Sequence, residues 1–138
     1  MKQRISLKEG VKFHGHLGPY LILGILAGEA ALKKLKYKKY FGLKVKVWGA
    51  NQKPKSCLID GLQLSTGATY GKGNIIKCVG PAIKIEITNR QNQKKITLSF
   101  KDPLAKQLGL VKAHMDAQNL ARALYRTEYS KLFKIRSS

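Results

Sequence analysis

The chain has 138 residues, of which 43% are hydrophobic, and this suits one globular domain around one core. Lys and Arg number 27 against 7 Asp and Glu, so the formal net charge is +20 and the surface attracts polyanions at low salt. Two cysteines, Cys57 and Cys78, are too few for a separate zinc-ribbon module. The longest uncharged apolar run, residues 17–28, is too short to span a bilayer, and we recognise no secretory signal. We therefore expect a cytoplasmic protein with no membrane span.

Most of the basic residues are Lys, and they are spread along the chain. Arg is the usual residue for bidentate recognition of phosphates and bases, so scattered Lys favours solubility over a specific nucleic-acid site. Nucleic-acid binding remains as a non-specific alternative that depends on charge alone. The lysines between residues 33 and 39 crowd the end of a predicted helix, where cations complement the helix dipole.

The first predicted element is a buried helix. Residues 5–13 lead into it without strong periodicity. Pro19 suits the first position of a helix, which we expect to run from residue 19 to about residue 36. Gly24 and Gly28 stand four residues apart on this helix, so one face permits the close approach of another element.

A strand and a second helix follow. Residues 43–48 alternate apolar and basic side chains, which is strand periodicity. Ser56 suits the N-cap of a helix from residue 57 to about residue 65. Residues 66–74 carry three glycines and predict a loop. Three more runs have the composition or the alternation of strands, and the last two form a hairpin: residues 75–79, 82–88 and 95–100.

The C-terminal third is predicted to be helical. A short helix begins at Asp102-Pro103, and a longer one spans about residues 113–133. Three aromatic residues of the longer helix fall on one face and predict a packing or dimer stripe: Tyr125, Tyr129 and Phe133. The order of elements predicts an α+β fold with a largely antiparallel sheet and helices on one face. We treat residues 1–138 as one domain, with a core at about 10–100 and a C-terminal helical segment at about 102–135.

His14 and His16 precede the first predicted helix. In an extended segment, residues i and i+2 point to the same side, so both imidazoles can face one cavity. Imidazole is the commonest metal-binding side chain. The alternative is a pair of histidines that cap, or hydrogen-bond near, the start of the helix. We interpret His114, near the start of the last helix, as a surface or capping residue.

Cys57 falls in the first turn of the second predicted helix. There the positive end of the helix dipole lowers the pKa of a thiol and favours the thiolate. Asp60 lies one turn later on nearly the same face, and Gln63 follows. A thiolate, a carboxylate and an amide on one stripe suit a metal or redox site. The alternative is a buried cysteine that packs as a small hydrophobe, with Asp60 capping its own helix.

The glycine-rich loop at residues 66–74 lacks the spacing of a phosphate loop, because Lys72 is followed by Gly73 and the next element is a strand. Its exposed N–H groups and Lys72 predict a turn that holds an anion or a cofactor, with Thr66 and Thr69 beside it. A tight structural loop explains the pattern equally well.

Two segments together resemble the FmdE family, which is named after one of the subunits of formylmethanofuran dehydrogenase. Residues 13–24, FHGHLGPYLILG, resemble its opening helix signature. Residues 57–63, CLIDGLQ, followed by TGATYGKGN at 66–74, resemble its second signature. The resemblance covers roughly residues 10–100. It implies an α-β-α-β(3) core, shared in outline with the catalytic domain of glyceraldehyde-3-phosphate dehydrogenase.

The same resemblance implies that His14, His16 and Cys57 face one pocket, which in several relatives is thought to hold a metal such as zinc. Relatives often form homodimers, and the enzyme complex that gives the family its name has its molybdenum or tungsten centre in other subunits. This chain departs from many relatives, which have cysteines where it has Gly18 and Ala68 and which carry a C-terminal zinc finger. With fewer thiols, the affinity for a soft metal is expected to fall.

Three functions follow as alternatives. In the first, the chain is a metal-binding subunit or accessory protein of a redox enzyme, with zinc or a similar divalent ion held by His14, His16 and Cys57, and with Asp60 in reserve. In the second, it is a stand-alone enzyme in which Cys57 is the nucleophile and His14 or His16 its base. In the third, it is a polyanion-binding protein that depends on its charge.

Overall fold

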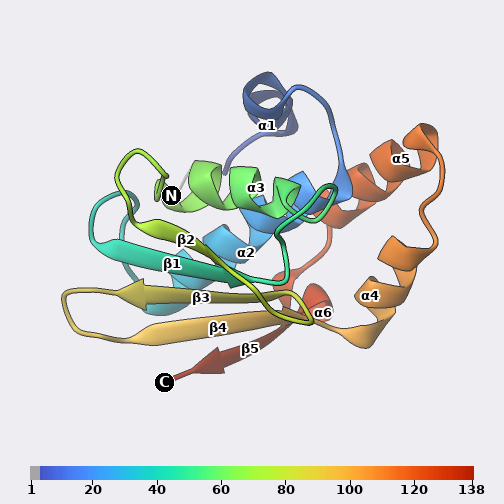
Figure 1. Ribbon diagram of the computed structural model, residues 1–138. Helices are drawn as coiled ribbons and strands as arrows, with labels where there is room; N and C mark the ends of the chain where they lie inside the picture. The colour runs from blue at the N-terminus through green and yellow to red at the C-terminus, as the bar shows by residue number, and fades with distance from the viewer. Residues whose placement is uncertain (1–3) are drawn as a thin grey trace.

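A five-stranded sheet forms one layer of the structure, a computed structural model that describes residues 4–138 (Figure 1). The strand order is β2-β1-β3-β4-β5. β1 and β2 are parallel, and every other neighbouring pair is antiparallel. The predicted α+β class with a mostly antiparallel sheet is therefore confirmed. In chain order the strands are Leu43–Trp48 (β1), Ile75–Cys78 (β2), Lys84–Asn89 (β3), Lys95–Phe100 (β4) and Phe133–Ser137 (β5).

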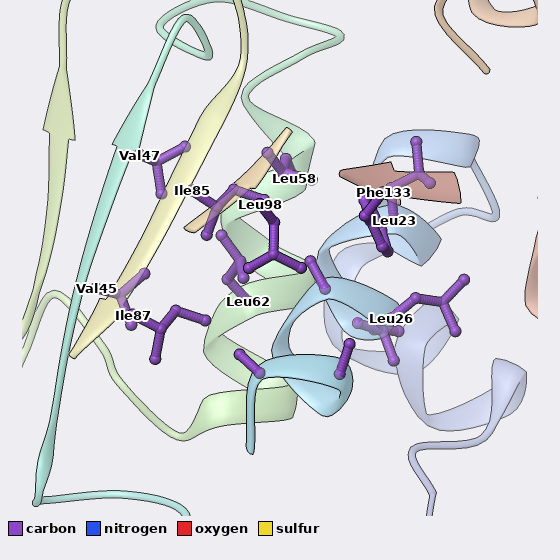
Figure 2. Packing of buried hydrophobic residues seen from close by; sticks show 14 of the residues in the cluster. Leu23, Leu26, Val45, Val47, Leu58, Leu62, Ile85, Ile87, Leu98 and Phe133 are labelled. Atoms are coloured by element: carbon purple, nitrogen blue, oxygen red, sulfur yellow. The ribbon is translucent and has the colours of Figure 1, made fainter. Parts of the chain in front are cut away.

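The hydrophobic core lies between this sheet and the helices. Alternate residues of β1, β3 and β4 are buried, and the strand register places them opposite one another, as in the pairs Val45–Ile87 and Ile85–Leu98. Figure 2 shows these side chains packed with leucines of α2 and α3, among them Leu26 and Leu62. The helices are Leu7–His14 (α1), Pro19–Leu35 (α2), Cys57–Thr66 (α3), Asp102–Gly109 (α4), His114–Tyr125 (α5) and Tyr129–Leu132 (α6).

The central helix, α2, is buried on nearly all sides, as expected for a helix that is apolar around most of its circumference. Pro19 occupies its start as predicted, and Lys36 ends it in the left-handed conformation. No single helix among residues 4–138 is long and apolar enough to cross a membrane; α1 and α2 reach the required length only as a pair bent by 120°.

Glycines allow α2 and α3 to touch backbone to backbone. A Cβ at Gly24 would overlap the carbonyl oxygen of Leu58, and a Cβ at Gly61 would overlap that of Leu21. One turn further along, the space beside Gly28 is filled by Ser65, whose hydroxyl donates to the carbonyl oxygens of Gly24 and Gly61 at 3.1 and 2.9 Å. The predicted close approach at Gly24 and Gly28 is confirmed.

The N-terminal ends of two helices, α1 and α3, differ from expectation. The segment before α2, for which the sequence showed no strong periodicity and no helix was predicted, contains α1, which begins with a capping box between Ser6 and Glu9. The Ser-x-x-Glu pattern is a sequence signature of a helix start, and it could have predicted α1 although the segment has no strong periodicity. The second difference concerns Ser56, which precedes α3 in a helical conformation and makes no side-chain cap.

The predicted long helix at 113–133 is wrong, because it is broken after Tyr125. The chain turns, forms the single turn of α6 and enters β5, which pairs with β4 so that Phe133 lies opposite Phe100. The three aromatic residues of the predicted stripe make their contacts within the chain. The hydroxyl of Tyr125 donates to the carbonyl of Ile5, the hydroxyl of Tyr129 donates to Glu29, and Phe133 is buried. These residues therefore do not form an exposed dimer stripe.

Because the α2–α3 contact has no room for a side chain, Gly24→Ala should lower the free energy of unfolding by about 1–3 kcal/mol, the cost of overpacking. Gly109→Ala is a matched control, since a Cβ at that helical position meets nothing within 4 Å. Chemical denaturation measures both variants. A Gly24→Ala protein as stable as wild type would contradict the close contact.

Candidate functional site

A small cleft of about 180 Å³ lies where the loop before α2, the start of α3 and the start of α5 meet. Its lining includes His14, His16, Cys57 and His114. The first three are the residues that the sequence predicted for one pocket, and they come from two segments more than forty residues apart. The fourth was expected at the surface or at a helix cap.

His14 is the last residue of α1, and its side chain is only 9% exposed. Its Nδ1 lies 2.5 Å from Oδ2 of Asp60 on α3. A carboxylate accepts the proton of Nδ1, which leaves Nε2 with a free lone pair in the neutral ring. Nε2 is buried, and among the described residues it has no hydrogen-bond partner. The structure thus leaves one buried ring nitrogen of a cleft-lining histidine without a partner.

Gly15 brings His16 beside His14. This glycine caps α1 with φ of +108°, a left-handed conformation that glycine adopts without strain. The chain reverses there, and the two imidazole rings lie 4.7 Å apart between centroids. The predicted convergence of the two side chains is correct, but the predicted extended segment is wrong, since His14 is helical.

His114 extends this pair into a row of three rings. Its centroid lies 6.1 Å from that of His16, and its Nε2 is 3.2 Å from the side-chain amide nitrogen of Gln118. Burial, followed by the fields of His14, His114 and Lys53, lowers the pKa of His16. We find no signal in the sequence for this role of His114, because the path from α4 to α5 brings it to the cleft.

Cys57 is the first residue of α3 and is half-buried. Burial and the neighbouring carboxylate of Asp60 raise the pKa of its thiol, and Lys53 opposes them. The direction is opposite to the lowering predicted from the helix dipole, because desolvation and a like charge both disfavour a thiolate. Within residues 4–138, no group of three or more His, Cys, Asp or Glu side chains is placed so that it could hold a metal ion as it stands.

The loop predicted to hold an anion lies beyond the other end of α3, away from this cleft. The threonine hydroxyls of this loop form hydrogen bonds within it. The hydroxyl of Thr66 accepts from the N–H of Ala68, and the hydroxyl of Thr69 accepts from the N–H of Lys72. The amide side chain of Asn74 ties the loop to the start of β1 through the carbonyls of Tyr40 and Leu43. The structure therefore does not bring Thr66, Thr69 and Lys72 together with the histidines.

Comparison with known proteins identifies the family. The family model described as "FmdE, Molybdenum formylmethanofuran dehydrogenase operon" matches residues 13–134. The chain belongs to the FmdE family. All four side chains singled out in the cleft fall inside the matched residues.

An FmdE-like fold is also found among solved structures. The crystal structure of an FmdE-like protein of the tungsten formylmethanofuran dehydrogenase type, from Syntrophus aciditrophicus, matches this chain with a TM-score of 0.67. The two are 17% identical, and the match covers 100% of this chain and 77% of that one. At this identity the likeness establishes the fold. No curated protein matches the chain.

The close approach of the histidines should lower the midpoint of the His16 titration in the metal-free protein. Because its pKa is lowered, His16 should take up a proton only below the ordinary value of 6.5. As pH falls through 6.5 the unfolded chain binds this proton first, so His16 reduces stability there. NMR titration of the ring protons measures the midpoint, and His114→Gln should move it upward. A wild-type midpoint at or above 6.5 would contradict the arrangement.

Proposed function

We propose that the cleft binds a divalent metal ion, zinc or one of similar preference, through His14, His16 and Cys57. In this proposal the chain is a metal-binding subunit or accessory protein of a redox enzyme. Two nitrogens and one sulfur suit zinc and leave a position open for water or substrate. A metal in such a site supplies Lewis-acid chemistry to the molecule in the open position.

The observation that carries the proposal is the state of His14. A buried imidazole nitrogen without a partner is costly, and such atoms are rare in folded proteins. Nε2 of His14 is of this kind, and His14 lines a cleft that is also lined by His16 and Cys57. A cation bound to its lone pair would satisfy it.

Asp60 supports the proposal as the partner of His14. Metal-bound histidines usually donate their second ring N–H to a carboxylate, which fixes the tautomer and makes the ring a better ligand. The 2.5 Å contact between Asp60 and Nδ1 of His14 has this form. We therefore assign Asp60 to orienting His14, in place of its expected role as a reserve ligand.

The raised pKa of Cys57 separates the metal site from the alternative of a cysteine nucleophile. A nucleophile needs a thiolate, which burial and Asp60 disfavour in the metal-free protein. A bound cation would reverse this balance and release the thiol proton. Metal binding should therefore weaken as pH falls, since protons compete for both Cys57 and the histidines.

Metal titration of protein prepared without a histidine tag tests the proposal. Cobalt is a useful probe because its spectrum reports sulfur ligation, and calorimetry then measures zinc. His14→Ala and Cys57→Ser should each weaken binding strongly, and Asp60→Asn should weaken it by about 10–100-fold, as for other carboxylates that orient a ligand. Cys78→Ser is the matched control, because Cys78 lies at the end of β2 outside the cleft.

Cobalt bound without a sulfur signature, or equal binding by the Cys57→Ser and Cys78→Ser variants, would remove Cys57 from the site. If His14→Ala also bound zinc like wild type, the cleft would not be a metal site.

We also propose that the chain forms homodimers, and that it works with other redox-enzyme subunits. The family resemblance supports both statements, whereas the aromatic stripe of the C-terminal segment no longer supports a dimer, because it packs within the chain. Sedimentation at high salt, which screens the +20 charge, should give the mass of two chains. A monomer at high micromolar concentration would contradict this.

A further inference from the structure

Exposed aromatic and lysine side chains gather where the parallel strands β1 and β2 begin. The connection before β1 and the connection before β2 lie side by side there, since the N–H of Tyr40 donates to the carbonyl of Thr66 at 2.8 Å (Figure 1). Five residues of these connections form what we call the aromatic–basic patch: Lys39, Tyr40, Phe41, Tyr70 and Lys72.

The aromatic members of the patch are unusually open to solvent. Phe41 is 77% exposed, and Tyr40 and Tyr70 are each 53% exposed. Lysines stand over two of these rings: Nζ of Lys72 lies 5.3 Å from the Phe41 centroid and 5.9 Å from that of Tyr40, and Nζ of Lys39 lies 5.3 Å from Tyr40. Exposed aromatic side chains that gather on one part of a surface are a mark of interaction sites.

Tyr40 is held in place by its backbone. It has φ of +92°, an uncommon conformation for a residue with a side chain, and such strain persists only where the surroundings enforce it. Its carbonyl accepts from the buried side chain of Asn74 at 2.9 Å, and its ring lies against Gly67, where a Cβ would overlap it. The backbone of Tyr40 is thus held by contacts with Asn74 and Gly67.

The charge around the patch has one sign. Residues 30–59 contain nine Lys and no Asp or Glu, and residues 61–85 contain three Lys and no Asp or Glu. The patch therefore attracts a polyanion, and its cations stand beside flat apolar rings. This combination is typical of surfaces on which unpaired bases stack while lysines contact the phosphates.

We propose that the aromatic–basic patch binds single-stranded nucleic acid. Phe41, Tyr40 and Tyr70 stack on unpaired bases, and Lys39 and Lys72 contact the backbone. Lys72, which the sequence pointed to as an anion-binding residue, acts here and not in the histidine cleft. A duplex, whose bases are already stacked, binds only through its charge. This inference does not depend on the metal site.

Fluorescence anisotropy with labelled oligothymidine, oligouridine and a duplex of equal length tests it at low salt. Either single strand should bind more tightly than the duplex, and comparison of the two strands shows whether DNA or RNA is preferred. Phe41→Ala should weaken single-strand binding about fivefold or more, the lower range for loss of one stacked base, while Phe41→Trp retains it. Val79→Ala is the matched control, because Val79 is 86% exposed at the far end of β2.

The lysines have a separate signature. Lys72→Ala should reduce the slope of log affinity against log salt by about 0.7, the value for one phosphate contact on a single strand. Lys106→Ala, which removes an exposed lysine on α4, should leave the slope unchanged.

Several outcomes would overturn the proposal. If Phe41→Ala and Tyr70→Ala bind like wild type, the chain attracts nucleic acid through charge alone. If anionic lipid vesicles bind with the same dependence on Phe41 and single strands do not, the surface faces a membrane. If Phe41→Ala converts a dimer into monomers in sedimentation, the patch is a contact between two copies of the chain.

Discussion

The close contact of α2 with α3 is the constraint on which the rest of the structure depends. Gly24 and Gly61 bring the two backbones together, and Ser65 fills the space left by Gly28. Because α3 is fixed against α2 in this way, its first residues come to rest beside the start of α2, where the chain has just passed through His14 and His16. The cleft is thus a consequence of helix packing, and a larger residue at either glycine would move Cys57 and Asp60 relative to the histidines.

Electrostatics divide the molecule into two regions with different chemistry. In the cleft, Asp60 contacts the ring of His14, and burial together with the fields of His14, His114 and Lys53 lowers the pKa of His16. At the start of β1 and β2 the chain presents lysines and open aromatic rings with no acidic residue in the surrounding sequence, so that region attracts anions. The proposed metal site and the proposed nucleic-acid surface therefore occupy different parts of the molecule.

The sequence was informative wherever the signal was local and periodic. Alternation predicted β1, β3 and β4, and Pro19 with the apolar run predicted α2. Prediction failed where tertiary contacts decided the outcome. The helix expected to reach Phe133 is broken because β4 offers an edge for Phe133 to pair with, and no local pattern encodes the position of that edge. The family resemblance predicted that His14, His16 and Cys57 share a pocket. The position of His114 in the same cleft depends on the course of the chain from α4 to α5, which the sequence does not reveal.

The central claim is that the unsatisfied nitrogen of His14 exists to hold a metal ion. A crystal structure of protein loaded with zinc, with diffraction recorded on both sides of the zinc absorption edge, tests it most directly. We predict one anomalous peak in the cleft, within bonding distance of Nε2 of His14 and of the sulfur of Cys57. A peak elsewhere on the molecule, with Nε2 still unliganded, would contradict the account.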